Sequence, residues 1–469
     1  MRRWLAPAIL TLVSLNLAVL AGGWSPAAAR AAFDTESPPP AAPLLSARRI
    51  PALLSRIVAD DRYSRTLSSV FTDPLYGSGL TSCLVVRHGG QTIYSRNATT
   101  SMVPASNLKL LTATAILKEF KPTDRFRTEV RAAASVTAGA LEGDLWIVGG
   151  GDPLLETADY AAFNSKSFHN KPHLHSSYEH LADLIASSGI KEVRGSVVGD
   201  ESRYDKQRYV PSWRPIYVSD GEAGPASSIE VNDGFSTFEP KPVGVGAPAT
   251  HAATLMTSLL AQRGVKVDGA PTEGAAPAGA RVVTVLPSLT IAEIVTEMMQ
   301  ESDNMTAELM VKELGYRKAA AGTTAVGLKA MTSILQGLGL PLAGFVAHDG
   351  SGLDRGDRAT CALLLATLAA AGPDSPLAKS LSVAGVNGTL VNRFVNTPIA
   401  GHLRAKTGSI DFVAALSGFL DNGTTVPVTF AMMANGLPKP GIVTRHLQDH
   451  LVEVLFTKPT APPIDRIAP

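Results

Sequence analysis

Residues 104–111 read PASNLKLL, and this stretch decides the fold because a serine and a lysine stand at the start of an apolar helix. The helix predicted over residues 106–120 is apolar almost all round, which is typical of a buried helix. Ser106 and Lys109 lie three positions apart and therefore share a face. The amine of Lys109 either extends along the helix to solvent or serves a polar neighbour, and Ser106 is the nearest candidate.

A lysine beside a serine can act as a base when it is buried. Loss of solvation lowers the pKa of a lysine, and a serine hydroxyl becomes a good nucleophile once a base takes its proton. The free N–H groups at a helix start also favour a developing oxyanion. The S-x-x-K spacing alone arises by chance, so a lysine that extends to solvent is the ordinary interpretation unless other motifs accompany it.

Two further motifs accompany it. Ser302-Asp303-Asn304 stands between helices predicted over residues 288–300 and 304–314, and Lys-Thr-Gly-Ser occupies residues 406–409 on a predicted strand of an antiparallel meander. S-x-x-K, S-D-N and K-T-G, in this order, form the set shared by class A β-lactamases and penicillin-binding proteins. The three motifs together therefore favour a serine acyl-transfer enzyme.

The chain resembles the D-alanyl-D-alanine carboxypeptidases/endopeptidases of the penicillin-binding protein 4 type. The segments VPASNLKLLTATAIL, GDLWIVGGGDPLL, ESDNMTAELM, HDGSGLDR, VAGVNGTL and LRAKTGSI follow the family order between residues 80 and 435. The resemblance implies an α/β (α+β) penicillin-recognising serine acyltransferase fold, in which an antiparallel sheet flanked by helices joins an all-α part. It also implies an insert between the first two motifs, where the composition changes to short β-like runs and Gly/Pro-rich loops.

The resemblance assigns the catalytic roles. It implies that Ser106 is the acylated nucleophile and Lys109 its general base. Ser302 and Lys406 would complete a proton path towards the leaving amine. Each role fits acyl transfer, which needs a nucleophile, a base and an acid for the leaving group.

The same resemblance assigns substrate binding. Asn304 would bind the peptide backbone, and Thr407, Gly408 and Ser409 would bind the terminal carboxylate beside Lys406. Backbone N–H groups of Ser106 and Ser409 would form the oxyanion hole.

One loop departs from the family pattern. Relatives carry an acidic residue shortly after a tryptophan, which contacts the amine of the substrate's diamino acid. Here the loop reads PSWRPIYVSDGEAG, so that Ile216 or Tyr217 stands at that position and Asp220 comes a few residues later. The preference for a substrate side chain is left open.

The chain is expected to divide into several parts. The basic start, the apolar run over residues 4–21 and the small residues after it are typical of a cleaved signal peptide, with an uncleaved membrane anchor as the alternative. Because no matched catalytic residue lies in the insert, we expect that it can be trimmed. The expected parts are a signal peptide (1–31), a Pro/Ala-rich linker (32–46), a discontinuous peptidase domain (47–124 and 286–457), a mostly β insert of two small domains (125–285) and a tail (458–469).

Two cysteines, Cys83 and Cys361, are separated by 278 positions, one in a strand-like run and one in a helix-like run. We expect two buried thiols. Export would also permit one disulfide.

Composition limits the partners. The 469 residues carry a formal net charge of +1 and no basic stripe, so no nucleic-acid partner is expected. Four histidines occur within residues 169–180, but Pro172 breaks their spacing, and we predict a solvated loop and no metal or other cofactor. The expected partners are peptidoglycan peptides and β-lactams, the expected location is the periplasm, cell wall or exterior, and the sequence specifies no oligomeric state.

Two other functions are alternatives to a D-Ala-D-Ala peptidase. A β-lactamase would carry the same motifs, but the 196 residues between Ser106 and Ser302 argue against it. A catalytically weak penicillin-binding or wall-scaffolding protein would use the insert to hold partners, but the intact motifs argue against loss of activity.

Overall fold

The computed structural model describes residues 51–457, apart from 168, 170–172, 424–425 and 439–440. The chain divides into two units, residues 1–59 with 460–469 and residues 60–459, and the sheets and all three motifs belong to the second. The signal peptide, the linker and the tail lie outside the described residues. No helix in the described part is both long and apolar enough to cross a membrane.

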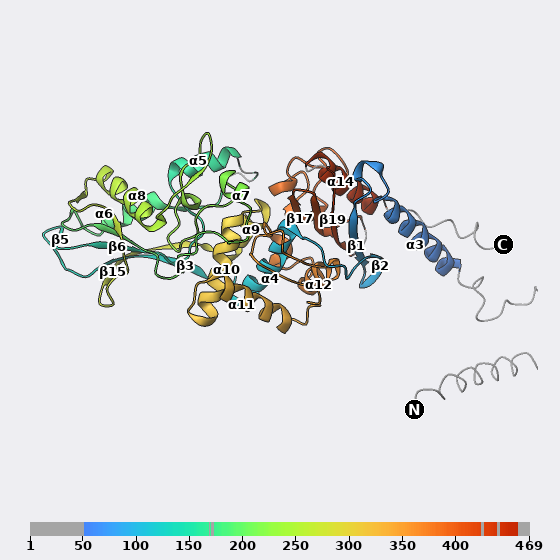
Figure 1. The fold of residues 1–469 in the computed structure, drawn as a ribbon, viewed down its shortest axis with the longest axis horizontal. Coiled ribbons are helices and arrows are strands. Elements are labelled where there is room, and N and C mark those ends of the chain that lie inside the picture. The colour runs from blue at the N-terminus through green and yellow to red at the C-terminus, as the bar shows by residue number, and fades with distance from the viewer. Residues whose placement is uncertain (1–50, 168, 170–172, 424–425, 439–440, 458–469) are drawn as a thin grey trace, which may run out of the picture. The chain divides into compact units, whose positions relative to one another are not determined.

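A six-stranded antiparallel sheet forms the core of the peptidase part (Figure 1). Its first strand in the chain pairs with its last, so that residues 81–88 lie against residues 428–435. The strands, in spatial order, are β16 (Ser382–Val383), β17 (Leu403–Ile410), β18 (Val413–Leu420), β19 (Val428–Asn435), β1 (Thr81–His88) and β2 (Gln91–Arg96).

Both faces of this sheet are covered because its strands are apolar on both sides. Leu84 and Val86 pack with the C-terminal helix α14 (Ile442–Phe456) on one face. Cys83 and Val85 face the helices on the other side, as alternation along a strand requires. Those helices, which include α4 (Lys109–Glu119) and α12 (Cys361–Ala371), carry the larger apolar cluster.

The helical part packs around α4. The predicted helix over residues 106–120 begins as a short 3₁₀ helix, η3 (Ala105–Leu108), and continues as α4. The helix expected to stop at Gly315 instead runs through it as α10 (Asn304–Ala319), and this glycine allows α11 (Thr324–Gly337) to pack closely. A Cβ at residue 315 would lie 2.9 Å from the backbone nitrogen of Gly327 on α11. The other helices of this part are α9 (Ile291–Gln300), α10 (Asn304–Ala319), α11 (Thr324–Gly337) and α13 (Pro376–Lys379).

The insert is mixed rather than mostly β. Its main sheet has parallel as well as antiparallel neighbours, and α6 (Tyr178–Ser187) and α8 (Pro248–Gln262) pack against it. The prediction of a mostly β insert with a helix or two underestimated this helical share, because Gly/Pro-rich loops dominate the composition between the helices. The main sheet orders β14 (Thr272–Glu273), β10 (Val197–Asp200), β6 (Leu145–Val148), β3 (Arg125–Ala132) and β15 (Arg281–Thr290). The insert's helices in the described residues are α5 (Ala158–Ser167), α6 (Tyr178–Ser187), α7 (Pro215–Ser219) and α8 (Pro248–Gln262).

Minor strands complete the insert. A second sheet orders β13 (Lys266–Val267), β9 (Glu192–Val193), β5 (Ala140–Leu141) and β4 (Val136–Thr137), and two-stranded pairs join β7 (Leu155–Glu156) to β8 (Ser176–Ser177) and β11 (Phe235–Thr237) to β12 (Val243–Gly244).

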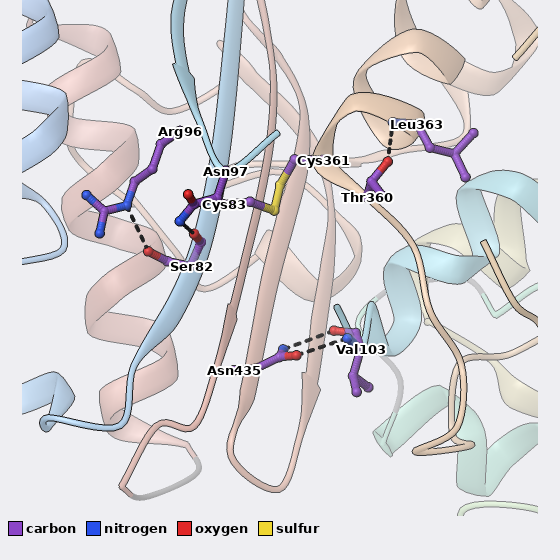
Figure 2. The surroundings of a disulfide bond; sticks show 9 residues. All are labelled: Ser82, Cys83, Arg96, Asn97, Val103, Thr360, Cys361, Leu363 and Asn435. Carbon is purple, nitrogen blue, oxygen red and sulfur yellow. Dashed lines mark hydrogen bonds between the residues drawn. A yellow bond between two sulfur atoms is a disulfide. The ribbon is translucent and has the colours of Figure 1, made fainter. Parts of the chain in front are cut away.

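The prediction of two buried thiols is wrong, because Cys83 and Cys361 form a disulfide (Figure 2). Cys361 is the first residue of α12, which packs on β1 and β19 and so places its start above Cys83. The two Cα atoms are 6.0 Å apart, which is within the usual range for a disulfide. The sequence could not indicate this disulfide, because the two cysteines are 278 positions apart and meet only when the first and last strands of the sheet pair.

Replacing both cysteines by alanine should lower the free energy of unfolding by about 2–4 kcal/mol, because the bond closes a long loop in the unfolded chain. Urea unfolding followed by tryptophan fluorescence measures this loss. The same protein treated with a reductant should match the variant. An unchanged midpoint in both would show that the bond contributes nothing to stability.

Candidate active site

The serine of the first motif stands on a tight turn. Ala105, the residue before Ser106, has φ +47°, a conformation that costs energy for a residue with a Cβ. Gly352 packs so closely on this turn that a Cβ there would lie 2.0 Å from the carbonyl oxygen of Ala105. The surrounding structure therefore holds Ser106, which is half-buried, at the wall of a cavity.

The amine of Lys109 is fully buried and contacts three separate segments. Its Nζ lies 3.2 Å from Ser106 Oγ, 2.7 Å from Asn304 Oδ1 and 2.9 Å from the carbonyl oxygen of Ser351. An ammonium has three protons to donate, so these contacts use its whole capacity. The interpretation of Lys109 as a lysine that extends to solvent is therefore wrong.

Burial lowers the pKa of Lys109 to about 8, while the negative charges of Asp303, Asp349, Glu308 and Glu222 oppose this shift. The amine is thus easier to deprotonate than an ordinary lysine, yet it still carries its proton most of the time at pH 7. The surrounding carboxylates thus limit how far burial lowers the pKa of this amine.

Lys406 is the second buried amine. Its pKa lies well below the ordinary value because of burial first and the charge of Lys109 second. Its Nζ donates to the carbonyl oxygen of Thr407 at 3.1 Å. Two amines within each other's field disfavour double protonation, so the positive charge of Lys109 favours the neutral form of Lys406.

The second motif forms the junction between α9 and α10. Asp303 caps α10 by accepting from the N–H of Thr306 at 2.6 Å. The cap fixes Asn304 as the first helical residue, and its side chain faces Lys109. Ser302 adopts φ +65° and lines the same cavity as Ser106. The motif thus places a second hydroxyl-bearing residue at the cavity of the nucleophile.

The third motif lies on β17, where it was predicted to lie. Thr407, Gly408 and Ser409 line the same cavity as the first two motifs. Gly408 leaves room for η3, which packs on this strand: a Cβ there would lie 3.0 Å from Asn107 Nδ2. Asn107 itself donates to the carbonyl oxygen of Lys406 at 3.1 Å and so ties the first motif to the third.

A turn at residues 349–354 supports Lys109 from behind. Glu308 accepts from the N–H groups of Gly350 at 3.0 Å and Ser351 at 2.9 Å. Asp349 accepts from the N–H of Gly352 at 2.7 Å. These bonds orient the carbonyl oxygen of Ser351 towards the amine. Burial, together with the charge of Asp349, raises the pKa of Glu308 to about 8.

The insert reaches into the site through residues 203–226. Trp213 Nε1 donates to Asp349 at 2.8 Å, and Asn304 Nδ2 donates to the carbonyl oxygen of Glu222 at 2.8 Å. Tyr204, Trp213 and Tyr217 share an apolar cluster with α10. The insert therefore bonds Asn304, one acceptor of the Lys109 amine, and Asp349, which belongs to the turn that presents the Ser351 carbonyl. These contacts argue against trimming the insert, which stays an untested prediction.

The cavity has a volume of about 430 Å³. Besides the predicted residues it is lined by Thr389, whose Oγ1 accepts from Thr407 Oγ1 at 2.8 Å. The segment VAGVNGTL carried this residue, but nothing in its spacing indicated a role. Ile216, Tyr217, Asp220 and Glu222 from the insert also line the cavity.

The histidine-rich loop is not simply solvated. His173 is buried, and its Nε2 lies 2.8 Å from Glu156 Oε1. His169 pairs with Glu301 at 2.9 Å. Within the described residues no group of three or more metal-ligating side chains occurs, so these two histidines pair individually with carboxylates.

A serine and a buried lysine on one helix, enclosed by an S-D-N junction and a K-T-G strand, define a serine acyltransferase of the penicillin-recognising class. The chain belongs to the D-Ala-D-Ala carboxypeptidase 3 (S13) family, whose model matches residues 64–244 and 236–458. It is accordingly a serine hydrolase.

Individual relatives agree with this assignment. The chain is 30% identical to a D-alanyl-D-alanine carboxypeptidase of Actinomadura sp. over 455 residues, with 80% of this chain and 81% of the relative covered. It is 30% identical to a carboxypeptidase of Mycobacterium tuberculosis over 416 residues, with 87% of each chain covered.

A solved structure shares the fold. Penicillin-binding protein 4 from Haemophilus influenzae matches with a TM-score of 0.70 at 20% identity, covering 83% of this chain and 99% of that chain. The same protein complexed with a β-lactam matches with a TM-score of 0.63. The family match, the curated relatives and this shared fold together confirm the resemblance to the penicillin-binding protein 4 type.

The rate of acylation by a penicillin should rise about tenfold per pH unit below pH 8 and level off above it. The reason is that only the deprotonated amine of Lys109 can take the Ser106 proton, and its pKa is about 8. Stopped-flow measurements with a fluorescent penicillin from pH 6 to 9.5 give the profile. A flat profile across this range would contradict the role of Lys109 as base.

Proposed function

We propose that this protein removes the terminal D-alanine from peptidoglycan stem peptides through an acyl-enzyme on Ser106. One observation carries the proposal: the buried Nζ of Lys109 lies 3.2 Å from Ser106 Oγ, with a lowered pKa. The family supplies the D-Ala-D-Ala bond as the expected substrate bond.

In the first half of the reaction, Lys109 takes the proton of Ser106 as Oγ attacks the carbonyl carbon of the penultimate D-alanine. The tetrahedral oxyanion would be bound by the backbone N–H groups of Ser106 and Ser409. The C–N bond then breaks, and a proton reaches the leaving amine through Ser302 from Lys406 or Lys109. Water hydrolyses the resulting ester, and Ser106 regains its proton.

The terminal carboxylate of the substrate would lie against β17. Thr407 and Ser409 offer hydroxyl groups at the cavity wall, and Lys406 on the same strand would add positive charge when it holds the proton of the lysine pair. Hydroxyl and cationic donors suit a carboxylate because hydrogen bonds to a charged acceptor are strong. Asn304 would bind the peptide backbone beside them.

A β-lactam should acylate the same serine, since its strained amide resembles the substrate bond. We propose a stable adduct rather than rapid hydrolysis, which would distinguish the protein from a β-lactamase. The family and the protein's similarity to a β-lactam-complexed relative support this proposal. An exported location, in the periplasm or the cell wall, agrees with such a substrate, and no metal is required by this mechanism.

Ser106→Ala should form no penicillin adduct, and Lys109→Arg should acylate at least ~10³-fold more slowly. Arginine keeps the charge but does not deprotonate, so the base is lost from a coupled catalytic unit. Intact-protein mass spectrometry with peptide mapping measures both. An adduct on another serine, or near-normal acylation of Lys109→Arg, would contradict the assignment.

The balance between carboxypeptidase and endopeptidase action depends on the group beyond the scissile bond. A cross-linked peptide places a second stem beyond the cavity, whereas a free terminus places only D-alanine there. Incubation with defined cross-linked and uncross-linked muropeptides would separate the two activities. We propose carboxypeptidase action because the family and both relatives carry that name.

We further propose that Glu222 receives the side-chain amine of the substrate's diamino acid. The positions just after the tryptophan hold Ile216 and Tyr217, and the acids of this loop that line the cavity are Asp220 and Glu222. Asp220 already contacts Lys241 Nζ at 3.2 Å. The carbonyl oxygen of Glu222 accepts from Asn304 Nδ2 at 2.8 Å, and this contact supports the proposal that the Glu222 side chain would lie beside the bound peptide.

Glu222→Gln should raise KM about two- to fivefold for a peptide with a free side-chain amine and leave an N-acetylated peptide unchanged, because an exposed ion pair contributes about 0.2–1 kcal/mol. D-Alanine release gives kcat and KM for both peptides. Asp220→Asn is the matched control and should change neither. Equal losses with both peptides would refute the role of Glu222.

A further inference from the structure

A second cavity, of about 580 Å³, lies apart from the catalytic one and shares no lining residue with it. It forms where β3 and β6 of the insert meet the ends of α4 and α10. Five arginines line it, against three carboxylates: Asp124, Glu129 and Glu313. Neither the catalytic mechanism nor the three motifs use these residues.

The sequence of β3 places the cations in a row. In RFRTEVRA, residues 125–132, the side chains of Phe126, Thr128, Val130 and Ala132 are buried. Arg125, Arg127, Glu129 and Arg131 alternate with them and so point to the opposite face. Neighbours on one face of a strand are about 6.7 Å apart. Arg125, Arg127 and Arg131 therefore offer positive charge along one line, which Glu129 interrupts.

Part of this charge is used internally. Arg203 forms a two-pronged ion pair with Glu313, with distances of 2.5 and 2.9 Å. Arg131 donates to Glu129 at 2.8 and 2.6 Å. These pairs account for two of the cavity's three carboxylates.

Two arginines keep most of their hydrogen-bonding capacity. Arg127 is 63% exposed and approaches Glu129 only to 3.6 Å. Arg317 is 59% exposed and approaches Glu119 only to 3.9 Å, while Lys318 makes the closer contact with that carboxylate. A guanidinium group binds phosphate and carboxylate through two parallel hydrogen bonds, so both are suited to an incoming oxyanion.

Aromatic rings fix the guanidinium groups around the cavity. The guanidinium of Arg203 stacks 3.9 Å from the ring centroid of Tyr316, and that of Arg317 lies 5.8 Å from the centroid of Phe120. Such contacts stabilise a cation without neutralising it. The cavity thus has positioned cations and apolar walls before any ligand arrives.

We propose that this cavity binds an extended polyanion that carries phosphate or carboxylate groups at intervals along its chain, separately from the catalytic reaction. The row on β3 matches repeated charges, and Arg127 and Arg317 supply the available donors. A polymer of the cell envelope held here would keep the enzyme near its substrate without entering the catalytic cavity. The proposal does not depend on which peptide the catalytic site cleaves.

The test uses the full mature chain with two defined probes, an inorganic polyphosphate and an oligogalacturonate of similar length, each labelled for fluorescence anisotropy at low salt. The double variant Arg127→Gln/Arg317→Gln should bind at least one probe about tenfold more weakly, since each exposed charge contact contributes modestly. Arg194→Gln is the matched control. Arg194 is 53% exposed, lies in the insert and pairs with Glu142 outside the cavity, so its replacement should change binding less than about twofold.

The rate of penicillin acylation provides the check on folding. It should be the same in the double variant and in Arg194→Gln as in the unchanged protein. Preference for polyphosphate would identify phosphate as the recognised group, and preference for oligogalacturonate would identify carboxylate. The proposal is overturned if neither probe binds, if the double variant binds both as well as the unchanged protein, or if Arg194→Gln weakens binding equally.

Discussion

The burial of one lysine amine is the constraint on which the rest of this structure depends. The Lys109 amine donates three hydrogen bonds, to a hydroxyl, a side-chain amide and a backbone carbonyl. These acceptors come from segments up to 242 positions away. An unpaired ammonium in the same place would be very costly. Each of the three acceptors must therefore be held firmly, and the neighbouring elements are arranged to do so.

The turn at residues 349–354 connects this lysine to the insert. Asp349 accepts hydrogen bonds from Gly352 and from Trp213 of the insert, and Glu308 holds the backbone that faces Lys109. Asn304 is likewise bonded to Lys109 on one side and to the insert backbone on the other. The insert is thus a wall and a support of the catalytic cavity, and its strand β3 carries a row of arginines that the reaction does not use.

The sequence predicts the motifs well because their chemistry is local. Ser106 and Lys109 share one helix face, and the K-T-G strand belongs to a meander with a clear hydrophobic pattern. Prediction from the sequence fails for residues that are distant in the chain and come into contact only in the folded structure. The Cys83–Cys361 bond requires the first and last strands to pair. Thr389, Asn107 and Glu222 carry no distinctive spacing, so only the packed chain reveals their place.

The most direct test of this account is the titration of Lys109 itself. In protein labelled with ¹³C at the lysine ε-carbon, the Lys109 resonance, assigned by its loss in Lys109→Arg, should titrate with a pKa of about 8. That value would show an amine desolvated by burial and restrained by nearby carboxylates. A pKa above about 10, typical of a lysine in water, would contradict the buried three-acceptor site and with it the assignment of Lys109 as the base.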